Sequence, residues 1–537
     1  MINLRLPMKN INAHFRILSL LAWLILLTSC QSEITLSTPS GVMIGNIQEH
    51  HVEFLGIPYA NAPVGDLRWQ APVPKAPFTE PYSAQQFQAA CPQFAQMNSV
   101  FNSNEDCLFL NVWRPINHQE NLPVMVFLHG GGLATGAGSE NRYNGQTLAI
   151  NQNVIVVSLN YRLGYLGFLS LPELTQEQGH SGNYGFLDQN LALQWVNNNI
   201  KSFGGNPNQV TLFGESAGAN SACLHLASPL SQDLFHNVIM QSQGLYSSCV
   251  NTLASQQESE ALGEAFADIV DCKENTLQCL RDKSIFRLNL SLFTKGYQNG
   301  PIHTSAALPL RANLDNYFLT QQPITVFQKG RGAHKNILMG VNKNEGTLFA
   351  SFDQDIENES QYAQALKEQY PLNHQQVTAL YPFSEYTNGN QAMADVLGDE
   401  TFVCRSQQLA QYLVRGGSQL YFYHFTQSID SYMQSALSLF GGNGMALGTF
   451  HASEIPYVFG VESIFGKLDE EAMVTSNLMQ ELWGSFSYHN KPSTTFPQPI
   501  WPLYDALTGS ILNINHQLTI SGGLKQEKCQ FWKQLGA

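Results

Sequence analysis

The chain is poor in positive charge. Its 537 residues include 27 lysines and arginines against 41 aspartates and glutamates, which gives a formal net charge of −14. A protein that binds nucleic acid needs lysine and arginine clustered on one face to attract the phosphates. We therefore expect no nucleic-acid partner.

Metal-binding patterns are missing as well. The nine cysteines include no C-x-x-C pair, which counts against a zinc site. Acidic residues gather at 353–359, but this segment lacks the glycine and the terminal glutamate of a calcium loop, so it is typical of a solvated face. The sequence predicts neither a metal nor a cofactor.

Linkers, repeats and low-complexity tracts are also absent. Strand-like and helix-like segments follow one another without a Pro/Ser-rich interruption. A chain of this length can hold several domains, but uninterrupted patterning favours one large domain. We predict that this domain occupies residues 41–537.

The N-terminal apolar run, residues 17–27, is too short to span a bilayer comfortably. Arg5, Lys9 and Arg16 precede it. A charged segment followed by a short apolar core is the arrangement of a secretory signal peptide. Residues 1–29 are therefore predicted to be a signal peptide, and the protein is predicted to be exported.

This segment ends in LTSC, residues 27–30, which resembles the bacterial lipobox. The resemblance implies that Cys30 is lipid-modified after cleavage and that residues 30–40 form a tether. Gln31 would then favour the outer membrane of a Gram-negative bacterium, with the periplasm as the other location. The alternative is an ordinary signal peptide cleaved nearby, with Cys30 as an incidental thiol.

The most informative segment is QVTLFGESAGA, residues 209–219, in which an apolar strand runs into G-x-S-x-G and then into a helix-favouring stretch. This pattern predicts a nucleophile elbow, a sharp strand-to-helix turn that exposes a serine hydroxyl. Gly214 and Gly218 leave room for the neighbouring backbone. A chance match in a glycine-rich turn is the alternative, but the flanking strand and small residues favour Ser216 as a nucleophile.

An upstream loop, HGGG at residues 129–132, follows another strand of the buried type. Successive glycines let backbone N–H groups approach the oxygen that becomes negative when a carbonyl is attacked. We predict an oxyanion hole made by Gly131, Gly132 and Ala217, with His129 as a structural residue beneath the loop. A phosphate-binding loop is the rival interpretation, but no G-K-[S/T] follows and the spacing does not fit G-x-G-x-x-G.

In an elbow-type site, a carboxylate and then a histidine follow the serine along the chain. Glu345 comes just after the apolar segment 336–341, and His451 lies on a glycine-led loop. Neutral His451 would take the proton of Ser216 while Glu345 holds the ring in the right tautomer. From spacing alone, a solvated glutamate and one more of the chain's 15 histidines remain the alternatives.

Several motifs together resemble the type-B carboxylesterases, the family that includes the cholinesterases. They are EDCLFLNVW at 105–113, FGESAGA at 213–219, GVNKNEG at 340–346 and HASEIPYVF at 451–459. The resemblance covers nearly everything from Gly41 to Trp532. It implies an α/β-hydrolase fold, a class α/β protein with a large sheet covered by helices.

The resemblance also implies the roles of individual residues. Ser216, Glu345 and His451 match the family's catalytic triad. Glu215 matches a family residue thought to tune the site electrostatically. A loop charge with only local hydrogen bonds is the alternative for Glu215.

Cysteine pairing cannot be deduced from the sequence alone. The family resemblance implies disulfides between Cys91 and Cys107, between Cys272 and Cys279, and between Cys404 and Cys529. Cys223 and Cys249 are left over and are expected to be free and buried. This cysteine usage agrees with export.

Strand-like apolar runs alternate with helix-like segments such as 186–200. The runs lie at 124–128, 154–159, 210–213, 238–240, 337–341 and 420–425. Such alternation predicts a mainly parallel central sheet covered on both faces by helices. Gly45 and Asn46, between two strand-like segments, suggest an antiparallel opening to the sheet.

Two departures from the family pattern bear on the substrate. The loop between Cys91 and Cys107 has no tryptophan, whereas cholinesterases use one there to hold the choline cation, so acetylcholine is a poor match. The segment PIHTS, 301–305, replaces the family's usual Val-Asp-Gly near the acyl pocket, and His303 could line or fill that pocket.

The sequence therefore predicts a serine carboxylesterase that hydrolyses small to medium, fairly apolar carboxylic esters through an acyl-enzyme. A catalytically silent adhesion or binding module is one alternative. The other is a carbamate or amide hydrolase that uses the same site. The oligomeric state is not predicted.

Overall fold

The computed structural model describes residues 32–93, 102–117, 119–244, 249–294, 311–330, 334–353, 355–428, 445–461, 468–495 and 499–536. The predicted signal peptide, Cys30 and the segment 301–305 lie outside the described residues. Within the described ranges, no helix combines the length and the apolar character needed to cross a membrane.

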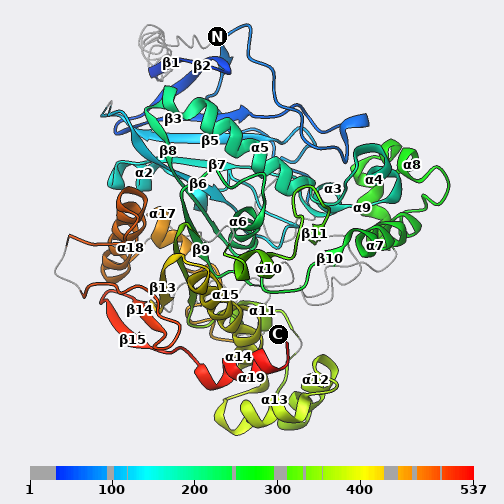
Figure 1. The fold of residues 1–537 in the computed structure, drawn as a ribbon, viewed down its shortest axis with the longest axis vertical. Helices are drawn as coiled ribbons and strands as arrows, with labels where there is room; N and C mark the ends of the chain where they lie inside the picture. The colour runs from blue at the N-terminus through cyan, green and yellow to red at the C-terminus, as the bar shows by residue number, and fades with distance from the viewer. Residues whose placement is uncertain are drawn as a thin grey trace, which may run out of the picture.

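One large sheet organises the described residues (Figure 1). It contains thirteen strands in the spatial order β1-β2-β3-β5-β7-β6-β8-β9-β12-β13-β14-β15, with β4 paired to β2. The bounds are β1 Ser32–Thr38, β2 Gly41–Ile47, β3 His51–Pro58, β4 Tyr82–Ser83, β5 Phe109–Pro115, β6 Leu122–Leu128, β7 Ile155–Leu159, β8 Gly205–Glu215, β9 Asn237–Gln241, β12 Asn336–Asn342, β13 Gln419–Phe425, β14 Ser510–Ile514 and β15 Thr519–Gly522. The short strands β10 Ala254–Ser255 and β11 Asn313–Leu314 pair with each other apart from it.

The sheet is mixed, with a parallel centre. All neighbouring strands from β7 through β6, β8, β9, β12 and β13 to β14 are parallel. On the other side, β1, β2, β3, β5 and β7 pair antiparallel in that order, as does β15 with β14, and the short β4 is parallel to β2. Every apolar run predicted to be a strand lies within one of the parallel strands, except that the run at 154–159 begins one residue before β7, and this confirms the predicted α/β class.

Helices connect the strands and cover the sheet. Their bounds are α2 Gln146–Gln152, α3 Gly164–Phe168, α4 Pro172–Gln178, α5 Tyr184–Asn199, α6 Ala217–Ala227, α7 Gln256–Ile269, α8 Thr276–Asp282, α9 Ile285–Thr294, α10 Pro323–Gln328, α11 Thr347–Ala350, α12 Glu359–Gln369, α13 His374–Leu380, α14 Gly389–Gly398, α15 Cys404–Arg415, α17 Ile455–Phe459, α18 Glu470–His489 and α19 Gln526–Gln534. Shorter turns are η1 Gly65–Leu67, η2 Asn141–Tyr143, η3 Ile200–Phe203, η5 Phe383–Glu385 and the π-helical η6 Asp399–Val403.

Alternate residues of the central strands enter two separate hydrophobic cores. In β6, Val124 and Val126 belong to one core, which includes residues of α5, α6 and α15, whereas Met125 and Phe127 belong to the other, with residues of α2, α17 and α18. Since side chains alternate between the faces of a strand, a sheet covered on both faces requires strands that are apolar throughout. This is why the central strands could be recognised as continuous apolar runs.

The N-terminal strands differ from the sequence expectation in one respect. Residues 32–38, predicted to belong to a tether, form β1 and pair with β2 from Ser32 to Thr38. This segment is an edge strand of the sheet, and its polar side chains are mostly exposed or half-buried. Main-chain hydrogen bonds hold such a strand, so its side-chain pattern gives little sign of it.

The turn that opens the sheet also differs in position. Gly45 and Asn46 lie inside β2, and the chain reverses at 48–50, where the Gln48 N–H donates to the His51 carbonyl (2.9 Å). Gly45 is small for a packing reason, because an added Cβ would lie 2.7 Å from the Phe54 ring. The antiparallel opening itself is confirmed.

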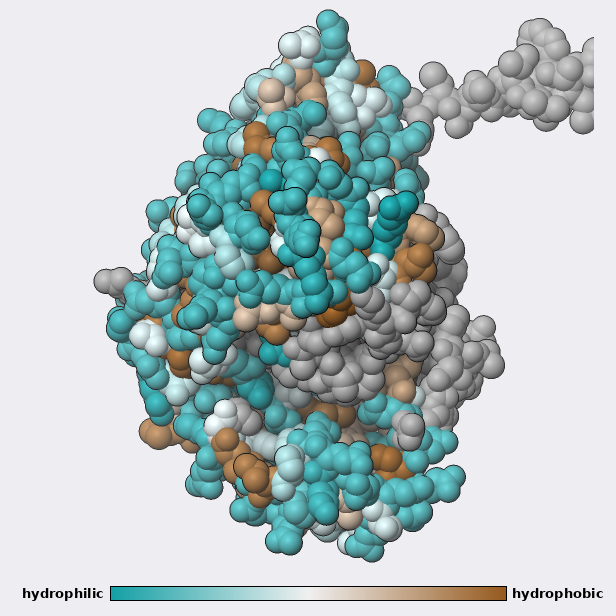
Figure 2. Space-filling view, turned by 90° about the vertical axis from the view of Figure 1, so that its right-hand side faces the viewer, coloured by the Kyte–Doolittle hydropathy of each residue, from teal (hydrophilic) through white to brown (hydrophobic). Residues whose placement is uncertain are grey.

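A helical lobe near the C-terminus has its own small core. The helices α12, α13, α14 and α19 lie together at the lower end of Figure 1. They enclose Tyr362, Tyr381 and Trp532, which are almost completely buried. On the face shown in Figure 2, hydrophilic residues predominate and hydrophobic residues form small separate groups.

All three predicted disulfides are present: Cys91–Cys107, Cys272–Cys279 and Cys404–Cys529. The prediction that the remaining two are free was wrong, because Cys223 of α6 forms a disulfide with Cys249. Both are completely buried, as expected. They are 26 residues apart, and only the packing of α6 beside the chain that follows β9 brings their Cα atoms within 6.2 Å.

Candidate active site

Ser216 stands at the junction between β8, which ends at Glu215, and α6, which begins at Ala217. Its backbone is in a strained conformation, with φ 55° and ψ −120°. The glycines on either side are required by close packing. A Cβ at Gly214 would lie 2.5 Å from the Gly218 carbonyl carbon, and a Cβ at Gly218 would lie 1.9 Å from the Leu128 carbonyl oxygen. The turn has the geometry predicted for a nucleophile elbow.

The HGGG loop lies directly against this turn. A Cβ at Gly130 would be 2.5 Å from Glu215 Oε2 and 3.2 Å from Ser216 Cβ. Gly131 and Gly132 have φ of 104° and 64°, a region that glycine adopts without strain. Ala217 is the first residue of α6, where the backbone N–H has no partner within the helix. The three predicted oxyanion-hole residues therefore lie on two segments that meet at Ser216.

His129 lies beneath the loop, as predicted. It is completely buried, its Nδ1 is 2.8 Å from the Gly130 carbonyl oxygen, and its ring stacks on Tyr161 at 4.3 Å. The Tyr161 hydroxyl donates to the His129 carbonyl (2.7 Å). Burial lowers the pKa of His129 to about 4, so the ring is neutral and serves to support the loop.

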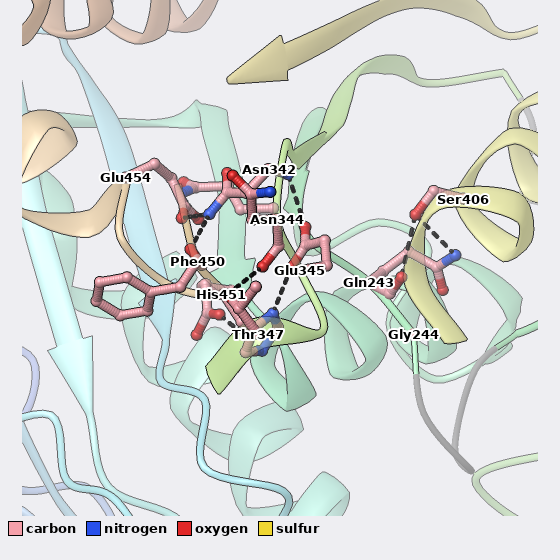
Figure 3. A network of polar contacts seen from close by, with 12 residues as sticks. Gln243, Gly244, Asn342, Asn344, Glu345, Thr347, Ser406, Phe450, His451 and Glu454 are labelled. Carbon is pink, nitrogen blue, oxygen red and sulfur yellow. Dashed lines mark hydrogen bonds and ion pairs between the residues drawn. The ribbon is translucent and has the colours of Figure 1, made fainter. Parts of the chain in front are cut away.

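Glu345 and His451 meet although 106 residues separate them (Figure 3). His451 Nδ1 lies 2.7 Å from Glu345 Oε2, and the Asn342 N–H donates to Glu345 Oε1 (2.7 Å). The Asn344 N–H donates to the Thr449 carbonyl (2.9 Å), and the Thr449 N–H donates back to Asn344 Oδ1 (3.0 Å). This reciprocal pair joins the loop that follows β12 to the loop that carries the histidine.

The other nitrogen of His451 faces a second carboxylate. Nε2 lies 3.1 Å from Glu215 Oε1, and neither atom has an aligned hydrogen-bond partner among the described residues. Burial opposes charging of the ring, but the charge of Glu215 together with the hydrogen bond and charge of Glu345 outweighs it and raises the pKa of His451 to about 9. For Glu215, burial opposes ionisation of the carboxyl group and raises its pKa to about 8.

A third buried carboxylate, Glu454, was not identified from the sequence. Its Oε1 accepts from Gln241 Nε2 (3.0 Å) and its Oε2 from Asn342 Nδ2 (2.6 Å). The Trp483 indole N–H in turn donates to Gln241 Oε1 (3.0 Å). Burial raises the pKa of Glu454. Only its position three residues after His451 could have drawn attention to it.

Arg142, whose charge acts on Glu215, and two phenylalanines that pack against the histidine also went unnoticed in the sequence. Arg142 Nη2 pairs with Glu140 Oε2 (2.8 Å), and its charge counteracts the effect of burial on the pKa of Glu215. Phe349 and Phe402 pack against the His451 ring, with centroid distances of 5.2 and 4.4 Å. Nothing in the residue pattern around Phe402 marks it as part of a site.

The positions of these groups follow from the sheet. Ser216, Glu345 and the HGGG loop come directly after the parallel strands β8, β12 and β6. Loops at the carboxyl ends of parallel strands gather on one edge of a sheet. In the described part of the chain, no cluster of three or more histidine, cysteine or acidic residues is arranged to hold a metal ion.

Comparisons with known proteins agree on one class. The family model described as "Carboxylesterase family" matches residues 32–532. Fumonisin B1 esterase of Sphingopyxis macrogoltabida is 33% identical, over 94% of this chain and 92% of that protein. Cholinesterase of Mus musculus is 32% identical, over 89% of this chain and 82% of that one. A solved structure of a PNB esterase has a TM-score of 0.79 and 30% identity, and the match covers 93% of this chain and 100% of that chain.

Proposed function

Since this chain belongs to the carboxylesterase family and is a carboxylic ester hydrolase, we propose that it cleaves its substrate through an acyl-enzyme on Ser216. The observation that carries the proposal is the buried pair His451–Glu345, joined at 2.7 Å, on the edge of the sheet where the elbow places Ser216. The substrates are small to medium, fairly apolar carboxylic esters.

Acylation begins with proton transfer. Neutral His451 accepts the Ser216 hydroxyl proton at Nε2 as the serine Oγ attacks the ester carbonyl carbon. Glu345 accepts a hydrogen bond from Nδ1, which fixes the tautomer and stabilises the imidazolium that forms. For this step Nε2, which faces Glu215 in the free protein, must be unprotonated and must offer its lone pair to the Ser216 hydroxyl.

The tetrahedral intermediate carries its negative charge on the former carbonyl oxygen. The backbone N–H groups of Gly131, Gly132 and Ala217 stabilise that charge. As the intermediate collapses, the bond to the alcohol oxygen breaks and His451 returns its proton to the leaving alcohol. A water molecule, deprotonated by the same histidine, then attacks the acyl-enzyme and releases the carboxylic acid.

Glu215 acts electrostatically. When ionised, it stabilises the His451 imidazolium that exists during both steps, since its Oε1 lies 3.1 Å from Nε2. Arg142 adds a positive charge that favours the ionised form of Glu215. Glu215 is therefore a neighbour that tunes the base, and it is not the residue that orients the ring.

A panel of substrates tests the proposal. We would measure hydrolysis of p-nitrophenyl esters of graded acyl length, with an amide, a carbamate and a choline ester alongside. Fumonisin B1 belongs in the panel because a relative is named for it. Ser216-dependent hydrolysis of the esters supports the proposal, and hydrolysis that survives Ser216→Ala contradicts it.

The two alternatives predict different results in the same panel. A silent binding module would hydrolyse none of the substrates, and the strained backbone of Ser216 argues against that alternative because such strain is usually kept where function needs it. A carbamate or amide hydrolase would prefer those substrates over the ester of equal acyl length.

Export and lipid attachment at Cys30 are part of the proposal. The disulfides of the described residues favour an oxidising compartment, because such bonds are rarely kept in the cytosol. Since residues 32–38 form a strand of the sheet, little chain separates Cys30 from the folded domain. A lipid on Cys30 would therefore hold the sheet edge formed by β1 close to the membrane.

A further inference from the structure

The His451 ring is packed against an aromatic side chain that the mechanism above does not use. The centroid of the Phe402 ring is 4.4 Å from that of His451, and the Phe402 side chain is almost completely buried. Phe349 lies 5.2 Å from His451 and stacks on Phe402 at 5.5 Å. The His451 imidazole is hydrogen-bonded to Glu345 and packed against the rings of Phe349 and Phe402. It therefore has little freedom to rotate, since close packing locks side-chain orientation.

Phe402 lies on the π-helical turn η6, directly after α14. Such turns are rare and often occur at functional sites. The helical segment formed by α14 and η6 also packs against the loop that carries Glu345. A Cβ at Gly346 would lie 1.8 Å from the Ala394 carbonyl oxygen, and a Cβ at Gly398 would lie 3.5 Å from Glu345 Cβ. The run formed by α14 and η6 therefore contacts both members of the His451–Glu345 pair.

The C-terminal helix α19 holds η6 at both ends. Asp399, the first residue of η6, is buried and forms an ion pair with Lys525, which lies immediately before α19. Cys404, the residue after η6, is bonded to Cys529 of α19. Phe402 lies between these two attachments.

We propose that Phe402 is a positioning residue for His451, and that α19 keeps it in place through Asp399 and Cys404. This inference rests on the proposed function, because Phe402 acts only through His451 as the catalytic base. Without the ring, the imidazole can turn away from the direction of Ser216. A small misplacement of the base slows the chemical step much more than it weakens substrate binding.

The first test compares Phe402→Leu and Phe402→Ala with a matched control, Phe383→Leu. Phe383 belongs to the same lobe and packs against Tyr362 at 5.9 Å, away from the His451 ring. We expect Phe402→Ala to lower kcat roughly 100-fold, with KM within about twofold of wild type. Phe402→Leu, which keeps most of the volume, should retain more activity, and Phe383→Leu should behave like wild type.

If Phe402 served only to stabilise the fold, its loss would not change the hydrogen bond between His451 and Glu345 in protein that remains folded. The proton between His451 Nδ1 and Glu345 should give a far-downfield resonance in the proton NMR spectrum. We expect that resonance to broaden or disappear in Phe402→Ala and to persist in Phe383→Leu, with thermal unfolding recorded for both. An unchanged kcat in folded Phe402→Ala, or a lowered kcat with the resonance intact, would overturn the inference.

The second test removes an attachment to α19. The double variant Cys404→Ser with Cys529→Ser should lower kcat and broaden the same resonance, whereas Cys272→Ser with Cys279→Ser should do neither. Equal effects of the two pairs would contradict the role of α19. Failure of the proposed function can be told apart from failure of this inference. It would appear as no hydrolysis by the wild type, or as hydrolysis that survives Ser216→Ala. Ser216-dependent hydrolysis that is insensitive to Phe402 would refute the positioning role alone.

Discussion

His451 Nε2 lies 3.1 Å from Oε1 of Glu215, the residue immediately before the proposed nucleophile. In the proposed mechanism this nitrogen accepts the serine proton, so the proposed base faces a carboxylate in the free protein. A negative charge at this position favours the imidazolium over the neutral ring. As a result, His451 is a stronger base than an ordinary histidine, but its ring also remains protonated up to a higher pH.

The first prediction concerns pH. The neighbouring carboxylates outweigh the opposing effect of burial and raise the pKa of His451 to about 9. Because only the neutral ring can act as a base, kcat/KM for the free enzyme should rise with pH through the neutral range, reach half of its maximum near this pKa and level off above it. A pH–rate profile on a neutral ester checks this, and a flat profile between about pH 5 and 8 would contradict a histidine base.

Glu215→Gln gives the matched measurement. The substitution removes the largest favourable charge acting on the imidazolium, so the acidic limb of the profile should move to lower pH. Glu33→Gln is a suitable control, since Glu33 lies on the edge strand β1 far along the sheet from β8. A limb that stays in place in Glu215→Gln would show that this carboxylate does not set the pKa of the base.

The second prediction concerns the triad. Ser216→Ala and His451→Ala should each lower kcat by roughly 10⁴-fold or more, because members of a triad act as a unit. The double variant should be no worse than either single one. Glu345→Gln should also be impaired, through the loss of the carboxylate that orients the ring. Steady-state kinetics and labelling by a phosphonyl fluoride provide the measurement, and an adduct on any residue other than Ser216 would refute the assignment.

The third prediction tests the contact between the HGGG loop and the elbow. An added Cβ at Gly130 would lie 2.5 Å from Glu215 Oε2, so Gly130→Ala must push the loop away from Ser216. We expect kcat to fall roughly 10²- to 10³-fold, the effect of losing one oxyanion-hole donor. Gly179→Ala is the control, because an added Cβ at Gly179 would meet no atom within 4 Å, even though the positive φ of Gly179 (80°) strains an alanine there. Similar kcat values for the two variants would argue against the predicted oxyanion hole.

The fourth prediction concerns attachment at Cys30. In its native host the protein should partition into detergent with the membrane fraction, and Cys30→Ser should release it or leave the signal peptide uncleaved. A form that begins near Ser32 should keep β1 and full esterase activity. Recovery of wild-type protein wholly in the aqueous fraction, with its initiating methionine intact, would refute both lipid attachment and export.

Some parts of the site could be predicted because they depend on local chemistry. The turn around Ser216 needs glycines at fixed offsets, and a parallel strand covered on both faces needs an unbroken apolar run. Both requirements leave marks that can be seen in a single sequence. The positions of Glu345 and His451 carried no such local mark, and the family resemblance supplied them.

Other parts could not be predicted, since they depend on which distant segments meet. The disulfide between Cys223 and Cys249 and the strand β1 are two examples. A main-chain pairing places no demand on side-chain type, and the spacing of two cysteines does not determine their distance in space.

The sequence by itself determined the class of fold, the elbow at Ser216 and the glycine loop beside it, because strand burial and tight turns restrict residue type locally. Only the tertiary structure decided what surrounds the base. The family resemblance had already suggested Glu215, but its distance from His451 and the presence of Glu454 and Phe402 near the ring follow from the fold. These residues come from β8, the loop after β13 and η6, which meet because the parallel strands end on one edge of the sheet and α14 packs against the loop that carries Glu345. Their effect on His451 depends on distance and burial, which are properties of the folded chain and not of any segment of its sequence.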